Sequence, residues 1–262
     1  MDNEQQLTGR ITDGPVRVIR SRGRGMRGHV VVLGNAVGHE SNLERDFLLQ
    51  ATLDRTLTAV TSQPMTIHFT GPNGASRYTP DFLTVHGGSP GTSLLIECKY
   101  RSDLYAEWRT LKPRLKAGRQ YARENGMELL ILTEKEIRTP ALEAARFLKP
   151  FGRLPRDEGI EEHLVHRLAV IGPADPAKLL AAAYASEINR DQAVGYIWKL
   201  IGNWRIEADL DQPLTMGTRI WIDMDGDWRR SDPYSWRPIA RRVAAAQARL
   251  GGSPARWGGA GK

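Results

Sequence analysis

Cysteine is almost absent from this sequence, with Cys98 the single example among 262 residues. One cysteine cannot form a disulfide within the chain, so a disulfide-stapled secreted scaffold is excluded and a reducing cytoplasm is the expected compartment. Long apolar runs are missing too, since no stretch approaches the about 20 consecutive apolar residues of a membrane-spanning helix. The polar start MDNEQQLTGR is unlike a secretory signal. We therefore predict a cytoplasmic protein with no membrane association.

Acidic residues are scarce at the two ends of the chain. The first 38 residues hold six arginines against three acids, and residues 228–262 hold eight basic residues against Asp232 alone. Because the net charge of the whole chain is +7, the part between the ends is close to neutral. Such basic ends either follow a phosphate backbone or remain solvated extensions, and the sequence leaves both open. The arginines predicted to contact DNA are Arg17, Arg20, Arg22, Arg24, Arg27, Arg229, Arg230, Arg241 and Arg242.

The segment 39–152 has the pattern of an α/β domain, preceded by a basic arm over 1–38. In chain order the expected elements are a helix from the capping box Ser41-Asn42-Leu43-Glu44, strands over 65–70, 77–85 and 93–100, a helix over 102–124 kinked near Pro113, a strand over 127–133 and a helix over 140–148. The three strands are joined by short turns like a meander. The run MELLILT is typical of a buried central strand that follows a crossover helix. This order predicts a mixed sheet flanked by helices.

A second domain is expected over 155–226, followed by a basic tail over 227–262. Its predicted elements are a helix over 159–170, a helix from the cap Asp175-Pro176 to about Ala185, a helix opened by Asn189, and two strands within 203–210 and 218–222. Three helices and a hairpin form the pattern of a winged helix-turn-helix domain. The tail also carries Trp228, Trp236 and Trp257 among its arginines. They could stack on bases or anchor a protein partner, and the sequence does not separate the two.

Two neighbouring strands each carry an acid near one end. Asp81 follows Pro80, and Glu97 stands two residues before Lys99, so Glu97 and Lys99 share a face while Cys98 points the other way. If the strands pair as a hairpin, Asp81 meets both on one surface. Carboxylate oxygens with water and phosphate are the ligands that Mg²⁺ prefers, and a nearby lysine adds positive charge. This set suits phosphodiester hydrolysis, although a solvated surface of cross-strand charges would have the same residues.

The pattern Pro-Asp…Glu-x-Lys resembles the PD-(D/E)xK nucleases, which have the restriction-endonuclease fold. A longer set of segments resembles TnsA, the endonuclease subunit of TnsA/TnsB-type transposases, over about residues 38–150. The matching segments are Ser41–Glu44, Gln63–Pro64, Thr79–Leu83, Ile96–Lys99 and Leu132–Ile137. A winged-helix domain after the nuclease is also what this family has.

The resemblance implies a role for each matching residue. Glu44 would be the acid that the helix brings to the site, Asp81 the central metal ligand, Glu97 a further ligand and Lys99 the catalytic lysine. Cys98 would offer its backbone carbonyl to the metal. The implied cofactor is Mg²⁺, with Mn²⁺ as a possible substitute. From the sequence alone, Glu44 could equally serve only as the fourth residue of its capping box, and Cys98 would be an inert buried thiol.

The activity implied by this resemblance is hydrolysis of a phosphodiester at the 5′ ends of a transposon, for cut-and-paste excision. The expected partners are double-stranded DNA at the transposon ends, a DDE transposase like TnsB and an AAA+ ATPase regulator like TnsC, in a bacterial cytoplasm and at the nucleoid during action. Two alternatives remain from the sequence. One is a freestanding restriction or repair nuclease of the same fold, and the other is a non-catalytic winged-helix regulator that binds DNA.

Overall fold

The computed structural model describes residues 27–87, 92–210 and 212–223. The described residues divide into two compact units, with the boundary between Ile137 and Arg138. The division falls before the helix at 140–148, which the sequence grouped with the nuclease domain; the boundaries at 152 and 155 stay predictions. Of the described helices, none combines the length and apolar character needed to cross a membrane.

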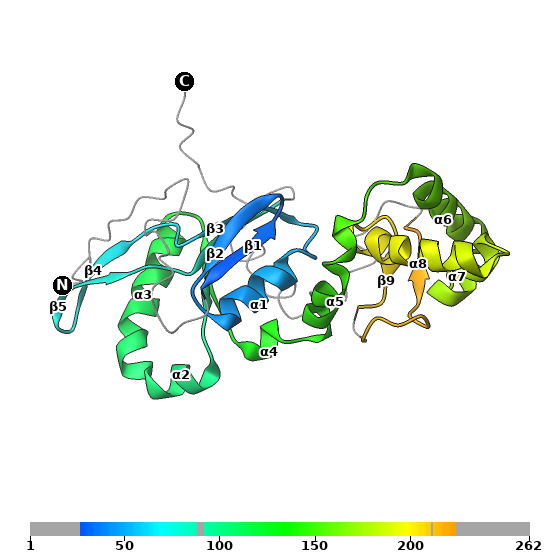
Figure 1. Ribbon diagram of the computed structural model, residues 1–262. Coiled ribbons are helices and arrows are strands. Elements are labelled where there is room, and N and C mark those ends of the chain that lie inside the picture. The colour runs from blue at the N-terminus through cyan, green and yellow to red at the C-terminus, as the bar shows by residue number, and fades with distance from the viewer. Residues whose placement is uncertain (1–26, 88–91, 211, 224–262) are drawn as a thin grey trace, which may run out of the picture. The chain divides into compact units, whose positions relative to one another are not determined.

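A four-stranded sheet organises the first unit (Figure 1). Its strands, in spatial order, are β3 (Leu57–Ser62), β6 (Phe82–His86), β7 (Thr92–Cys98) and β8 (Glu128–Leu132). β6 pairs antiparallel with β3 and β7, whereas β7 and β8 run parallel. The parallel pair needs a crossover, which α2 (Arg101–Ala106) and α3 (Trp108–Glu124) provide. The predicted mixed sheet flanked by helices is confirmed.

Three details of the predicted sheet are wrong. β3 was missed because its sequence LTAVTS is polar and partly exposed, with only its end residues Leu57 and Ser62 buried. The strand expected over 77–85 is interrupted at Thr79–Asp81, and only its second part, β6, joins the sheet. β8 was expected in the centre but lies at one edge of the described sheet.

Two antiparallel hairpins accompany the sheet. They are β1–β2 (Gly28–Val32 and Asn35–His39) and β4–β5 (Ile67–Gly71 and Gly74–Tyr78). β1–β2 packs against the first helix, and β4–β5 against α3 (Figure 1). The arm predicted over 1–38 therefore extends too far, because a hairpin begins at Gly28 and turns at Leu33 and Gly34, both with positive φ. Residues 1–26 lie outside the described residues.

Helices cover both faces of the sheet because successive strand residues point to opposite sides. On one face, the ring of Phe47 from α1 (Asn42–Ala51) lies 5.1 Å from the ring of Phe82. On the other, Leu83 belongs to a buried cluster with Leu115 of α3. The long helical stretch breaks at Glu107, between α2 and α3, rather than at Pro113, which lies inside α3. A short helix, α4 (Glu134–Ile137), follows β8 and was not predicted.

The second unit contains the predicted helices and a short strand pair. Its elements are α5 (Pro140–Leu148), the 3₁₀ turn η1 (Phe151–Arg153), α6 (Glu158–Ile171), α7 (Pro176–Ala183), α8 (Glu187–Gly202), β9 (Glu207–Ala208) and β10 (Ile220–Trp221). Asp175 caps α7, accepting a hydrogen bond from the Lys178 amide as expected. α8 begins before the predicted Asn189, with Ser186 at its N-cap. β9 and β10 are antiparallel.

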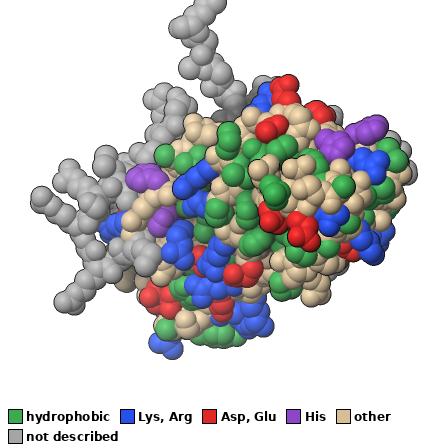
Figure 2. All heavy atoms as spheres, turned by 45° about the vertical axis from the view of Figure 1, so that its right-hand side comes forward, with side chains coloured by type: hydrophobic (Ala, Val, Ile, Leu, Met, Phe, Trp, Pro, Cys, Tyr) green, Lys and Arg blue, Asp and Glu red, His purple; other side chains and the backbone are tan. Residues whose placement is uncertain are grey.

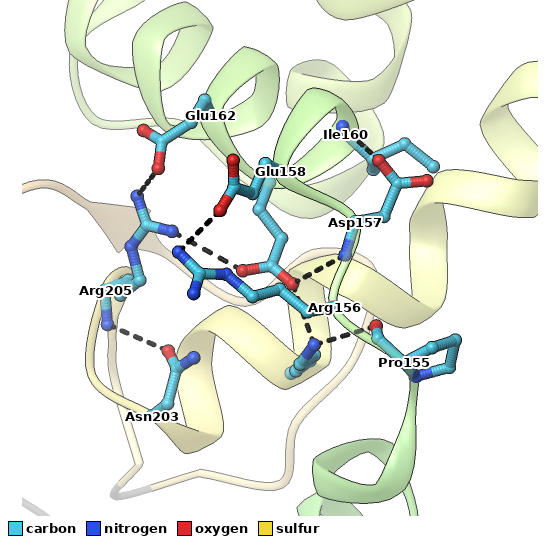
Figure 3. A network of polar contacts seen from close by, with 10 residues as sticks. Pro155, Arg156, Asp157, Glu158, Ile160, Glu162, Asn203 and Arg205 are labelled. Carbon is cyan, nitrogen blue, oxygen red and sulfur yellow. Dashed lines mark hydrogen bonds and ion pairs between the residues drawn. The ribbon is translucent and has the colours of Figure 1, made fainter.

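A polar network fixes the end of α8 and the segment after it to the start of α6 (Figure 3). The Lys199 ammonium donates to Glu161 at 2.7 Å and to the Pro155 carbonyl at 2.9 Å. Arg205 reaches Glu161 at 3.5 Å and Glu162 at 2.8 Å. Glu161 is 4% exposed, so this buried carboxylate has two cationic partners. The network therefore has a structural role within the unit.

Candidate active site

Asp81 stands directly before β6, where the chain enters the sheet. Its Oδ2 accepts a hydrogen bond from the Cys98 amide at 2.7 Å, and its backbone carbonyl accepts one from the Gln63 amide at 2.8 Å. Phe82 pairs with Ile96 in the antiparallel register, so the next position places Asp81 opposite Glu97. The two acids named by the sequence thus meet at one end of β6 and β7.

Glu97 lies in β7 and is 7% exposed. The Tyr78 hydroxyl donates to its Oε2 at 2.9 Å. Burial raises the pKa of the Glu97 carboxyl to about 7, against the opposing effects of the Tyr78 hydrogen bond and of the Lys99 charge. Arg114 of α3 also favours the ionised form of Glu97. The effect of burial thus outweighs the contacts that favour the ionised form of Glu97.

Glu44 serves as part of a helix cap and also acts on Asp81 and Glu97 through its charge. The Ser41 hydroxyl accepts from the Glu44 amide at 3.1 Å, and the Glu44 Oε2 accepts from the Glu40 amide at 2.7 Å. A standard capping box would use the amide of Ser41 instead. Burial raises the pKa of Glu44, and its charge in turn raises the pKa of Asp81. Glu44 can therefore take part in the helix cap and still lie close enough to Asp81 to act on it through its charge.

Lys99 is the cation that all three acids share. Its charge favours the ionised forms of Glu44, Asp81 and Glu97. Its backbone amide donates to the Leu132 carbonyl at 3.0 Å, which ties the end of β7 to the end of β8. Burial nevertheless raises the pKa of Asp81 well above its usual range, and the negative charges of Glu97 and Glu44 add to the effect. The acids at this site are short of positive charge.

The thiol of Cys98 is not a candidate nucleophile. Its thiol is buried, and burial, followed by the charges of the three acids, raises its pKa well above the usual range. A buried thiol that stays protonated is a poor nucleophile. What Cys98 contributes visibly is the amide that holds Asp81; a role for its carbonyl stays a prediction.

The donor set fits a hard divalent cation. In both Asp81 and Glu97 one carboxylate oxygen is held by a protein donor, and the other accepts no hydrogen bond from a residue that the structure describes. Oxygen ligands from one or two carboxylates are what Mg²⁺ requires. Within the described residues, however, no three His, Cys, Asp or Glu side chains are gathered closely enough to hold a metal by themselves. Asp81 and Glu97 are the adjacent pair, and Glu44 acts on them through its charge.

Most of the arginines predicted to bind DNA cannot be placed. Arg17, Arg20, Arg22, Arg24, Arg229, Arg230, Arg241 and Arg242 lie outside the described residues. Arg27 is described, and its guanidinium lies 4.0 Å from the Glu40 carboxylate.

A set of cations on α3 was not predicted from the sequence. Six exposed basic residues share this helix, and none forms an ion pair with a residue that the structure describes: Arg109, Lys112, Arg114, Lys116, Arg119 and Arg123. Apart from Arg114, they are spaced three or four residues apart, so they line one face of the helix over about 21 Å. Figure 2 shows Lys and Arg side chains, with Asp and Glu side chains among them, on the lower part of one face of the molecule. The three-and-four spacing was the available signal.

Two further residues position the acids: Tyr78, for which there was no signal in the sequence, and Gln63, which belongs to a segment that resembles the TnsA family. Tyr78 holds Glu97, and its pKa is raised well above the usual range by burial and by the Glu97 charge, so the hydroxyl remains a donor. Gln63 adopts a left-handed conformation with φ of 46° while its amide holds the Asp81 carbonyl. Non-glycine residues in this region are strained and are concentrated at functional sites.

The comparison with protein families gives one match. Residues 54–134 match a family described as TnsA-like endonuclease N terminal. The match contains Asp81, Glu97, Cys98 and Lys99, whereas Glu44 precedes it. The predicted resemblance to the TnsA-like endonucleases is confirmed over this part of the chain, and it supports an endonuclease subunit of a transposase in general terms. No curated protein matches the sequence.

Proposed function

We propose that this chain, whose residues 54–134 match the TnsA-like endonuclease family, hydrolyses a phosphodiester at the 5′ ends of a transposon during cut-and-paste excision. The observation that carries the proposal is the pair of Asp81 and Glu97. Each has one oxygen held by the protein, each has a raised pKa, and both lie within the influence of Lys99. Buried acids short of positive charge are characteristic of a site that binds a cation.

The side chains divide the work as follows. Asp81 and Glu97 would hold the metal through the oxygens left without a protein donor, and Glu44 would add negative charge from the helix. The Lys99 ammonium places a compact positive charge beside them, where it can neutralise charge on the phosphate. When bound, Mg²⁺, or Mn²⁺ in its place, supplies Lewis acidity and lowers the pKa of water. Cys98 contributes its amide to Asp81 and, by the family resemblance, its carbonyl to the metal.

An anionic phosphodiester substrate fits the positive charge on α3 near the site. The six cations on α3 have no ion-pair partner among the described residues, and Arg114 lies close enough to favour the ionised form of Glu97. Cations without carboxylate partners can neutralise phosphates and release counterions. We therefore assign α3, together with the two basic ends, to contacts with double-stranded DNA.

The remaining parts of the proposal concern the second unit and the partners. Three helices, α6 to α8, and the β9–β10 pair follow one another in the order of a winged-helix domain, and we assign that fold to the unit. A DDE transposase like TnsB would cut the other strand, and an AAA+ ATPase like TnsC would regulate the reaction. The second unit and the basic tail are the candidate surfaces for these partners.

The experiment that tests the function is strand cleavage in a reaction reconstituted with the transposase partner. Asp81→Ala should lower cutting of the 5′ strand by at least about a thousandfold, because charge stabilisation at the phosphate is lost. Glu44→Gln keeps an acceptor for the Glu40 amide, so a steep loss of cleavage at an unchanged melting temperature would assign Glu44 to the site. Glu187→Gln, an exposed change in the second unit, is the control. Cutting by Asp81→Ala at the level of the control would reject the proposal.

A further inference from the structure

Tyr78 occupies an unusual place between the core and the candidate site. It is the last residue of β5, it is 6% exposed, and it belongs to the buried cluster that α3 shares with the sheet. A buried tyrosine hydroxyl needs a hydrogen-bond partner. Here that partner is one oxygen of Glu97, at 2.9 Å. The ring is fixed by apolar packing, and its hydroxyl fixes the carboxylate.

This hydrogen bond decides which Glu97 oxygen remains for a ligand. Oε2 is held by Tyr78, so the carboxylate cannot turn about its last bond without losing the one hydrogen bond that it accepts from a described residue. Oε1 is therefore the oxygen that remains available to a ligand. Residues that hold a metal-binding side chain in one orientation act through preorganisation, because a carboxylate that is already oriented loses less freedom when it binds.

The backbone of Gly118 lies close to the Tyr78 ring. A Cβ at this position of α3 would lie 2.5 Å from Cε1 of Tyr78 and 3.1 Å from its Cδ1, with Cδ2 of Leu129 also at 3.1 Å. Real Cβ atoms do not approach ring carbons to 2.5 Å, so any side chain at 118 would push the ring away. Glycine inside a helix is less stable than alanine. Close approach of the tyrosine ring gives the reason for glycine here.

We propose that Tyr78 and Gly118 form a positioning pair for Glu97, in which Gly118 makes room for the tyrosine ring and Tyr78 presents one carboxylate oxygen to a divalent cation. The inference rests on the proposed function, since it concerns the same site. Neither residue touches the reacting atoms, so both act through Glu97. The pair accounts for a buried polar contact that core packing alone does not require.

The test measures Mg²⁺ binding to the full chain by titration calorimetry in the absence of DNA, and the Mg²⁺ dependence of cleavage in its presence. Tyr78→Phe keeps the ring and removes the hydroxyl. We expect about tenfold weaker Mg²⁺ binding, the lower end of what loss of such a supporting contact costs. The half-saturating Mg²⁺ concentration for cleavage should rise by the same factor, while kcat at saturating Mg²⁺ changes less. Tyr121→Phe removes a hydroxyl from the same buried cluster without touching Glu97 and is the matched control.

Gly118→Ala provides the second variant. It should weaken Mg²⁺ binding in the same direction, and in the Tyr78→Phe background it should weaken it little further, because both changes act on one contact. Gly195→Ala, a helical glycine of the second unit whose Cβ would meet Leu154 at 3.1 Å, controls for added bulk in a helix. A purely structural role would lower the melting temperature and leave Mg²⁺ binding unchanged. That result for both Tyr78→Phe and Gly118→Ala would overturn the positioning pair. If wild-type protein neither cleaves DNA nor binds Mg²⁺, the proposed function itself is rejected and the pair with it.

Discussion

The pKa values of two buried glutamates in this molecule are shifted in opposite directions. Glu97 in the first unit is 7% exposed and Glu161 in the second is 4% exposed. The pKa of Glu161 is lowered, first by the hydrogen bond from Lys199, with Arg205 adding to it. The pKa of Glu97 is raised to about 7 by burial, because its direct partner, Tyr78, is neutral.

The difference shows that burial alone does not reveal what a carboxylate is for. Glu161 has a full complement of cations within its own unit, so it needs nothing further and holds α6 to the end of α8. Glu97, with Asp81 and Glu44 nearby, has more negative charge than Lys99 and Arg114 offset. An acid that the fold leaves short of positive charge is a candidate for binding a cation or a substrate.

The largest effect is expected from Glu97→Gln, which should stabilise the protein in the presence of a chelator at pH 8. The unfolded chain ionises near 4.5 and the folded one at about 7, so stability falls as the pH rises through this window and the cost is complete above it. The gap corresponds to roughly 3 kcal/mol. Glutamine retains an oxygen that can accept from Tyr78. Urea denaturation at pH 5 and pH 8 measures the effect.

At pH 5 the difference in stability should shrink to under about 1 kcal/mol, and added Mg²⁺ should stabilise wild type more than the variant at pH 8. Glu187→Gln, an exposed glutamate, should change stability little at either pH. If Glu97→Gln is less stable than wild type at pH 8 in chelator, Glu97 is a structural residue like Glu161, and the comparison fails.

A smaller effect of opposite sign is expected from Lys199→Met in the second unit. Lys199 is 13% exposed and donates to Glu161 at 2.7 Å, so its removal leaves Arg205 as the cationic partner of a buried carboxylate. We expect a loss of about 2 kcal/mol in the free energy of unfolding. Lys178→Met is the matched control, because Lys178 is 77% exposed in its pair with Asp175 and should cost under about 0.5 kcal/mol. Equal losses in urea denaturation would show that Glu161 does not depend on Lys199.

The sequence predicted that Asp81, Glu97 and Lys99 lie together, but not the residues that hold them. Two-residue alternation puts Glu97 and Lys99 on one face of a strand, and pairing with the preceding strand brings Asp81 alongside. Tyr78 could not be predicted in this way. In an unbroken strand over 77–85, residues 78 and 81 would face opposite sides, and only the interruption at Thr79–Asp81 brings both to Glu97. The prediction of a continuous strand over 77–85 took Pro80 as part of the Pro-Asp motif and not as the residue that interrupts the strand.

The contacts that distinguish the two glutamates could not be predicted from the sequence either. Glu161 and Lys199 are 38 residues apart, and no local pattern specifies such a pair. The α3 cations were visible as a three-and-four spacing, yet a charged helix face has the same appearance whether or not it has partners. β3 was missed for a related reason, since a strand with exposed threonines lacks the apolar alternation that marks a half-buried strand.

The smallest expected effect distinguishes the two glutamates at acidic pH. Because the pKa of Glu161 is lowered, first by Lys199, its charge stabilises the folded chain above the unfolded value of 4.5, and this stabilisation is lost as the pH falls through the folded pKa. Glu161→Gln should therefore make the decline in stability below about pH 4.5 shallower, while leaving the slope between pH 5 and 7 as in wild type. Glu97→Gln should do the reverse, flattening the neutral range and leaving the acid range. Urea midpoints at half-unit pH steps from 3 to 8 would separate the two curves. If both variants change the same pH range, burial outweighs the cationic partners and the contrast between the two sites is lost.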